Sequence, residues 1–135
     1  MVRIKTEYQG DLHCTSVHTP SNTELATDAP VDNQGRGESF SPTDLVAASL
    51  GTCMLTTMGI VARTLDFDLT GASARVDKEM SSTPPRKINR LTVEIRVPRT
   101  TSPESRQRLE NAAHTCPVKK SLHPDIETPI EFFWG

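Results

Sequence analysis

The chain of 135 residues has the length of one domain, and we expect residues 1–135 to form a single one. Apolar residues make up 35% of it and aromatic residues 4%, which is little for a self-contained core and favours a core shared with a second copy. Charged residues account for 24% and the net charge is −2, which excludes a polybasic nucleic-acid binder and a highly charged disordered chain. Residues 1–8 contain no apolar signal-peptide core, and the odd number of cysteines, three, disfavours a secreted disulfide framework. We therefore expect a cytoplasmic protein.

Alternating apolar and polar residues open the chain. Residues 2–8 have the two-residue period of a half-buried strand, residues 9–11 have turn composition, and residues 12–17 can return as the second strand of a hairpin. A weaker strand pattern covers residues 24–27. Residues 28–40 are rich in Gly, Pro, Asp and Asn, so we expect a long loop, which in a compact domain is usually functional or mobile.

The strongest helix signal begins at Ser41. Ser41 can cap the helix, Pro42 suits its first position, and Asp44 completes an arrangement like a capping box. Residues 45–62 contain no charge, which predicts a helix buried on all sides or a membrane span. Ser, Thr and Gly interrupt the apolar run and strand patterns flank it, so we expect a central helix packed on a sheet and on a partner subunit rather than a span.

The second half of the chain alternates strand and helix patterns. Strands are predicted over residues 72–78, 88–97 and 130–134, and helices over residues 102–113 and 116–122. With strands before and after the helices, the pattern predicts an α+β domain with a mainly antiparallel sheet.

The three cysteines differ in their sequence context. Cys53 lies in the middle of the apolar helix, where a free cysteine is as often a small buried apolar residue as a reactive group. Cys116 directly precedes Pro117 and therefore sits at the N-cap of a short helix, where free backbone N–H groups and Lys119 favour a thiolate; the alternative is a cap without chemical use. Cys14, on a predicted strand, is interpreted as structural.

The spacing of cysteines and histidines disfavours a metal site. Cys53, Cys116, His114 and His123 are the available ligands, but the chain has no Cys-x-x-Cys and no His-x-x-x-His pair. The interpretation of His114 as a helix C-terminal cap is favoured over that of a general base. The sequence also has no phosphate-binding loop, dinucleotide fingerprint or serine-hydrolase elbow.

Two segments resemble the OsmC/Ohr family, which comprises osmotically inducible protein C and the organic hydroperoxide resistance proteins. Residues 40–53, FSPTDLVAASLGTC, resemble its first cysteine motif, and residues 114–122, HTCPVKKSL, resemble its second. The order of the predicted elements also fits this family, so the resemblance covers essentially the whole chain. Within the family the chain is most similar to the OsmC-like subgroup. It implies an α+β fold with a mainly antiparallel sheet wrapped around a long buried helix, in an intertwined homodimer.

The resemblance implies a thiol-dependent peroxidase that reduces organic hydroperoxides to alcohols. Cys53 matches the peroxidatic cysteine, which becomes a sulfenic acid, and Cys116 matches the resolving cysteine, which closes a disulfide with it. A dithiol or lipoyl-type reductant would restore the pair, with neither metal nor cofactor, and with no nucleic acid or membrane as partner.

One departure from the family pattern leaves a second function open. The hydroperoxide resistance members activate the cysteine with an arginine held by a glutamate ten residues before it, and that position here is Thr43. Arg36, Asp44, His18 and Glu127 are the candidates for a supporting role in this chain. The alternative function is a non-catalytic dimeric binding or stress protein of the same fold with unactivated cysteines.

Overall fold

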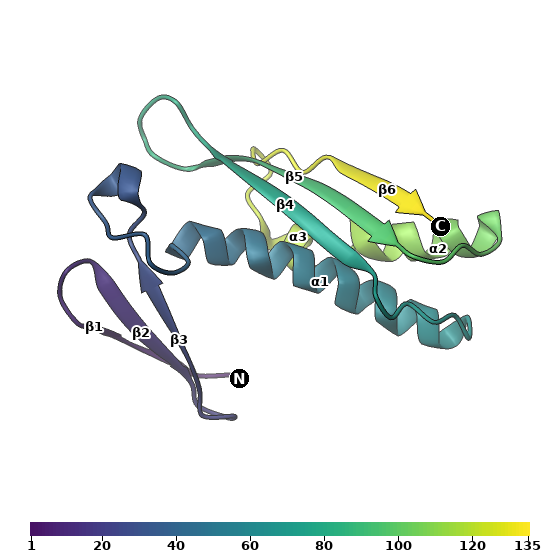
Figure 1. The fold of residues 1–135 in the computed structure, drawn as a ribbon, viewed down its shortest axis with the longest axis horizontal. Coiled ribbons are helices and arrows are strands. Elements are labelled where there is room, and N and C mark those ends of the chain that lie inside the picture. The colour runs from purple at the N-terminus through teal and green to yellow at the C-terminus, as the bar shows by residue number, and fades with distance from the viewer. The chain divides into compact units, whose positions relative to one another are not determined.

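The structure is a computed structural model that describes residues 1–135. The chain forms two compact units, Met1–Val46 and Ala47–Gly135. Six strands, three α-helices and one short 3-10 helix follow the predicted order, strands first, then the long helix, then two strands, two helices and a last strand (Figure 1). The single-domain organisation of residues 1–135 stays a prediction.

A three-stranded antiparallel sheet forms the first unit. Its strands are β1 (Ile4–Tyr8), β2 (His13–His18) and β3 (Thr23–Asp28), in the order β1-β2-β3. In the β1–β2 turn, Gly10 and Asp11 have positive φ of 88° and 52°, conformations that glycine and aspartate tolerate best. A 3-10 helix, η1 (Val31–Asn33), interrupts the loop that follows β3.

The long helix α1 (Pro42–Thr64) begins where the capping signal predicts. Ser41 Oγ accepts the backbone N–H of Asp44 at 3.1 Å, and Asp44 Oδ2 accepts the backbone N–H of Ser41 at 2.9 Å, which is a reciprocal capping box. At the other end the Phe67 N–H bonds back to the Ala62 carbonyl at 2.9 Å across Asp66, which has φ 51°. This left-handed residue terminates the helix in the manner of a Schellman motif.

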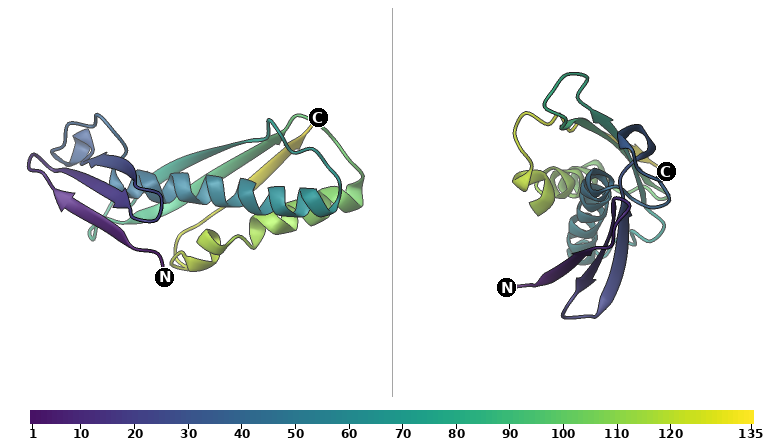
Figure 2. Two further views of the ribbon diagram at one scale, coloured as in Figure 1. Left: turned by 90° about the horizontal axis from the view of Figure 1, so that it is seen from below. Right: turned by 90° about the vertical axis from the view of Figure 1, so that its left-hand side faces the viewer.

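The second unit contains a separate sheet in the order β4-β5-β6. Its strands are β4 (Ser73–Met80), β5 (Ile88–Val97) and β6 (Ile130–Trp134), and its further helices are α2 (Pro103–His114) and α3 (Pro117–Ser121). Strand β5 pairs antiparallel with β4 but parallel with β6, because α2 and α3 carry the chain back to the end at which β5 began (Figure 2). The predicted single sheet is therefore wrong in detail: the chain has two small sheets, since the strands before α1 pair only with one another.

The core of the second unit lies between one face of the β4–β6 sheet and the helices. Its fully buried side chains include Leu50, Met54, Met58, Leu91, Val93, Ile95 and Leu109. The opposite face of the sheet carries charged residues, with Arg75 paired to Glu94 at 3.4 Å. A Cβ added to Gly51 would lie 3.2 Å from Val76 Cγ2, so the absence of a side chain at this turn of α1 permits close approach to β4.

Helix α1 is buried on one face only within this chain. Leu50, Met54 and Met58 are inaccessible, whereas Ile60 is 61% exposed. The prediction of burial on all sides is thus not met by the single chain, because no element of the second unit covers the face that carries Thr52, Thr56 and Ile60. By length and composition α1 could also cross a membrane, a test that core helices of soluble proteins pass as well.

Candidate thiol site

Cys53 and Cys116 are neighbours inside the second unit. Their side chains are close enough to share a hydrogen bond and to influence each other's charge, and neither forms a disulfide in this structure. Cys53 lies half-buried in the middle of α1, and Cys116 lies between α2 and α3 with no accessible surface. The structure therefore brings together the two cysteines that the sequence singles out, although 62 residues separate them in the chain.

The backbone around Cys116 positions its sulfur as a helix cap. Cys116 is the N-cap of α3, with Pro117 at the first helical position, and its Sγ accepts the backbone N–H of Lys119 at 3.4 Å. The N-cap predicted from the Cys-Pro pair is confirmed. Because the sulfur is used in capping, its distance from the α3 backbone is fixed.

The environment of Cys116 keeps its proton in place. Burial raises the pKa of the Cys116 thiol, and the hydrogen bond and charge interaction with Cys53 raise it further. The backbone N–H groups of Lys119 and Val118 act in the opposite direction and lower this pKa, but the net shift is upward. The helix N-terminus thus acts on the pKa of Cys116 in the predicted direction, but burial outweighs it. A protonated Cys116 can donate its S–H to the sulfur of Cys53.

Arg36 lies half-exposed beside a charge cluster of the first unit that is centred on the buried Asp28. Its Nη2 lies 3.8 Å from Oδ1 of Asp28, whose side chain is 2% exposed. The same Oδ1 lies 2.6 Å from His13 Nδ1, and Asp28 Oδ2 accepts the backbone N–H of Glu38 at 3.1 Å. Hydrogen bonding to His13, followed by the charges of His13 and Arg36, keeps the pKa of Asp28 below its ordinary value of 3.8.

Asp28 is a structural centre of the first unit that was not predicted from the sequence. The carboxylate fastens the loop after β3 to the sheet, since it binds a strand residue, His13, and two loop residues, Arg36 and Glu38. An aspartate at the end of a strand, directly before a loop rich in glycine and proline, is the signal that points to it.

The other three supporting candidates each have a partner of their own. Asp44 belongs to the capping box of α1. His18 Nδ1 is hydrogen-bonded to Ser21 in the β2–β3 turn, and Glu127 forms an ion pair with Arg90 beside β5. These contacts give the three residues structural roles in the described structure.

No metal cluster accompanies the thiols. Across residues 1–135, no group of three or more His, Cys, Asp or Glu side chains is arranged to hold a metal ion. Cys14 stands on β2 opposite Tyr8 of β1 and Thr27 of β3 and is half-buried.

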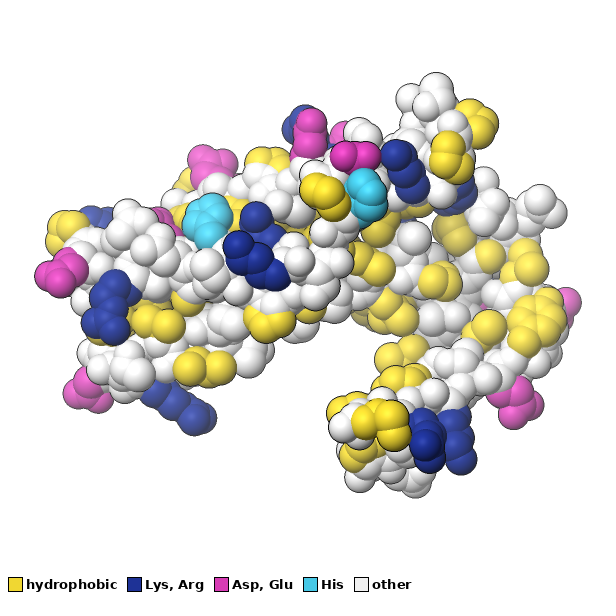
Figure 3. Space-filling view, turned by 180° about the vertical axis from the view of Figure 1, so that it is seen from behind, with side chains coloured by type: hydrophobic (Ala, Val, Ile, Leu, Met, Phe, Trp, Pro, Cys, Tyr) yellow, Lys and Arg dark blue, Asp and Glu magenta, His cyan; other side chains and the backbone are white.

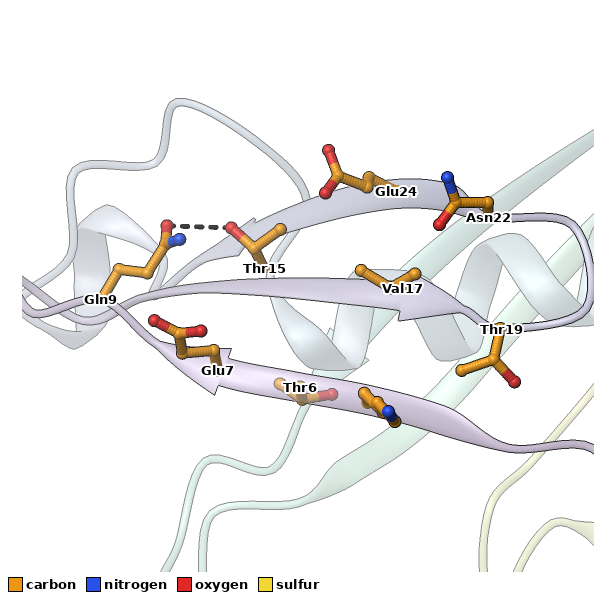
Figure 4. Close-up of a pocket in the computed structure, with 9 residues that line it drawn as sticks. Thr6, Glu7, Gln9, Thr15, Val17, Thr19, Asn22 and Glu24 are labelled. Atoms are coloured by element: carbon orange, nitrogen blue, oxygen red, sulfur yellow. Dashed lines mark hydrogen bonds between the residues drawn. The ribbon is translucent and has the colours of Figure 1, made fainter.

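A hollow of about 460 Å³ lies over the face of the β1–β3 sheet that is opposite to the Cys14 side chain (Figure 4). Polar and charged side chains line it, among them Lys5, Glu7 and Glu24, and Gln9 and Thr15 join across it by a hydrogen bond of 2.8 Å. No cysteine or histidine lies among the residues that line it.

Cys53 and Cys116 both lie in a segment of the chain that matches a known protein family. The family model described as OsmC-like protein matches residues 35–131. The chain belongs to the OsmC family. No curated protein matches the sequence.

Solved structures of OsmC proteins resemble this chain over nearly its whole length. A protein from Psychrobacter arcticus, provisionally described as an osmotic stress induced and detoxification response protein, is 45% identical with a TM-score of 0.92, over 98% of this chain and 96% of that one. An organic hydroperoxide resistance protein OsmC from Legionella pneumophila is 16% identical with a TM-score of 0.78, over 98% and 96%. An organic hydroperoxide resistance protein from Elizabethkingia anophelis is 14% identical with a TM-score of 0.80, over 100% of this chain and 96% of that one. The last two likenesses concern the fold alone.

Proposed function

We propose that this OsmC protein is a thiol-dependent peroxidase that reduces organic hydroperoxides through Cys53 and Cys116. The observation that carries the proposal is the contact between the two thiols, one buried and protonated and the other half-buried on α1. A peroxidatic cysteine must be reachable by substrate, and a resolving cysteine must wait beside it with its proton. Cys53 is more accessible to a substrate than Cys116, and the buried Cys116 is the thiol that keeps its proton.

The reaction has two chemical steps on the protein. The Cys53 thiol releases its proton to water, and the thiolate attacks the distal oxygen of the hydroperoxide. An S–O bond forms as the O–O bond breaks, which leaves Cys53 as a sulfenic acid, and the alkoxide takes a proton from water and departs as an alcohol. The Cys116 sulfur then attacks the Cys53 sulfenic acid, the S–S bond forms, and hydroxide leaves with the Cys116 proton as water. A dithiol or lipoyl-type reductant returns both cysteines to thiols and becomes a disulfide itself, so no metal or organic cofactor takes part.

The working unit in this proposal is a cytoplasmic homodimer. Low apolar content, one-sided burial of α1 and the exposure of apolar residues in both units support a second copy of the chain as partner. Figure 3 shows hydrophobic side chains reaching the surface among charged ones. Neither a nucleic acid nor a membrane is a partner in the proposal.

The supporting roles of Arg36, Asp44, His18 and Glu127 stay predictions, and none is needed to state the reaction. Thr43, where the hydroperoxide resistance proteins have a glutamate, favours a second candidate, a non-catalytic binding or stress protein of the same fold. In that protein Cys53 would be an ordinary thiol, with no reaction at neutral pH beyond that of a free cysteine.

Consumption of cumene hydroperoxide in the presence of dithiothreitol tests the proposal. The purified protein is compared with Cys53→Ser, and Cys14→Ser serves as the matched control because Cys14 lies in the other unit, on β2. We expect turnover that Cys53→Ser abolishes and Cys14→Ser preserves. Consumption by the wild-type protein equal to that by Cys53→Ser would favour the binding protein instead.

A further inference from the structure

The hydroxyl of Thr57 joins α1 to the end of α2 within the second unit. Thr57 Oγ1 lies 3.1 Å from the Cys53 carbonyl oxygen, 3.0 Å from that of Met54 and 3.1 Å from that of Ala112. The first two contacts are what a threonine inside a helix ordinarily makes. The third crosses to a helix 55 positions away in the chain and connects the two halves of the thiol site.

The Ala112 carbonyl leads directly to Cys116. Thr115, the C-cap of α2, shares its backbone N–H between the carbonyls of Asn111 at 3.1 Å and Ala112 at 3.3 Å, and Cys116 donates its own to Ala113 at 3.4 Å. Ala113 and Cys116 have no accessible surface. Ala112 lies four residues before Cys116, and the buried Ala113 and the hydrogen bonds of this turn leave the short segment between them little freedom.

We propose that Thr57 is a positioning residue for disulfide formation between Cys53 and Cys116. This proposal rests on the peroxidase function proposed above. A hydroxyl carries one hydrogen, and when Thr57 donates it to Ala112 the turn of α1 that bears Cys53 is tied to the segment that bears Cys116. The two sulfurs must come from hydrogen-bond distance to about 2.05 Å with a defined dihedral angle, a step that depends strongly on alignment.

The first chemical step gives Thr57 no such role. Attack on the hydroperoxide forms no bond to the Cys116 sulfur. Its rate therefore depends on the position of Cys116 only through the S–H contact with Cys53, and much less than disulfide formation does. Thr57 thus acts on the second step, in which the Cys116 sulfur displaces hydroxide from the Cys53 sulfenic acid.

Thr57→Val removes the hydroxyl and keeps the shape of the side chain. Thr56→Val is the matched control, because the exposed Thr56 hydroxyl donates to the Thr52 carbonyl at 2.7 Å within α1 and to no other helix. Reduced protein is mixed with one equivalent of cumene hydroperoxide, quenched at intervals with dimedone and an alkylating reagent, and analysed by mass spectrometry. In Thr57→Val we expect unchanged loss of the Cys53 thiol and disulfide formation slowed roughly tenfold, the effect of one lost hydrogen bond. Thr57→Ser restores the rate, and Thr56→Val matches the wild type.

Equal disulfide rates in Thr57→Val and the wild type would overturn the proposal, as would slowing of both steps to the same extent.

A second measurement needs no peroxide: each protein is equilibrated with glutathione redox buffers and the disulfide fraction is measured. We expect the disulfide to be about tenfold less favoured in Thr57→Val, a shift of roughly 30 mV, and an unchanged potential would contradict the role. A wild-type protein inert toward hydroperoxide would refute the peroxidase, and this equilibrium would then decide the role of Thr57 by itself.

Discussion

At the scale of single residues, the proposed reaction divides two tasks between Cys53 and Cys116 that one thiol does poorly. A reactive sulfur has to be reachable and ionised, whereas a resolving sulfur has to stay protonated until the sulfenic acid has formed. Burial and the hydrogen bond with Cys53 raise the pKa of Cys116, so the resolving thiol is kept out of competition for the substrate.

Removal of the resolving thiol makes this division measurable. In Cys116→Ser the sulfenic acid formed on Cys53 has no neighbouring thiol to condense with, so we expect it to accumulate and to be trapped by dimedone in a stoichiometric adduct. The wild-type protein under the same conditions gives mainly the disulfide and little adduct. An equally small adduct yield in Cys116→Ser would contradict the assignment of Cys53 as the attacking residue.

Asp28 gives the first unit a dependence on pH. Its pKa is lowered in the folded state by His13, so its contribution to stability is present above the ordinary value of 3.8 and is lost as pH falls through the lowered value. We expect Asp28→Asn to melt at a lower temperature than the wild type near neutral pH. The difference should narrow as the pH falls below 3.8, where the wild-type carboxylate becomes protonated. A constant difference over this range would mean that the charge of Asp28 plays no part.

At the scale of the elements, the ends of the helices are set by local chemistry. Ser41 and Asp44 close the capping box of α1, and Ser102 Oγ accepts the backbone N–H of Ser105 at the start of α2. Such caps satisfy N–H groups that have no partner inside the helix, so they mark a helix start in the sequence itself.

Substitution of the first of these caps tests its contribution. Ser41→Ala removes one half of the capping box, and we expect the free energy of unfolding to fall by about 1 kcal/mol. Thr52→Ala is the control, because the exposed Thr52 hydroxyl bonds only to carbonyls of its own helix and alanine is the better helix former. Urea denaturation followed by circular dichroism measures both variants. A Ser41→Ala protein as stable as Thr52→Ala would show that the box contributes nothing.

The elements were predictable to within two residues because their signals are local. Alternation in residues 88–97 and the Pro that follows each helix cap suffice for β5, α1, α2 and α3. The division into two sheets and the parallel pairing of β6 with β5 depend on contacts between distant segments, which periodicity does not encode. The same limit applies to the site: the Cys-Pro cap was predictable, whereas the contact of Thr57 with Ala112 and the burial of Asp28 by its loop were not.

At the scale of the whole molecule, the single chain leaves much apolar surface in water. The exposed apolar residues include Ile4, Tyr8, Leu25, Val31, Phe40 and Ile60. Ile4, Tyr8 and Leu25 lie on one face of the β1–β3 sheet by their register, among polar residues such as Thr6 and Ser16. Large apolar side chains exposed on one face favour an interface there, which agrees with the low apolar content of the sequence.

We expect light scattering after size exclusion to give a particle of about 30 kDa, twice the 14.9 kDa of the chain. Ile60→Glu places a charge on the exposed face of α1, where Ile60 is 61% exposed, and burial of that charge against a second copy would be unfavourable. The variant should therefore shift toward 15 kDa and lower thermal stability, since copies that share a core are stabilised by association. Glu104→Lys, an exposed charge change in the first turn of α2, is the control and should leave the mass at the wild-type value. An Ile60→Glu protein that keeps the wild-type dimer mass would place the interface elsewhere on the chain, and a wild-type mass of 15 kDa would refute the dimer itself.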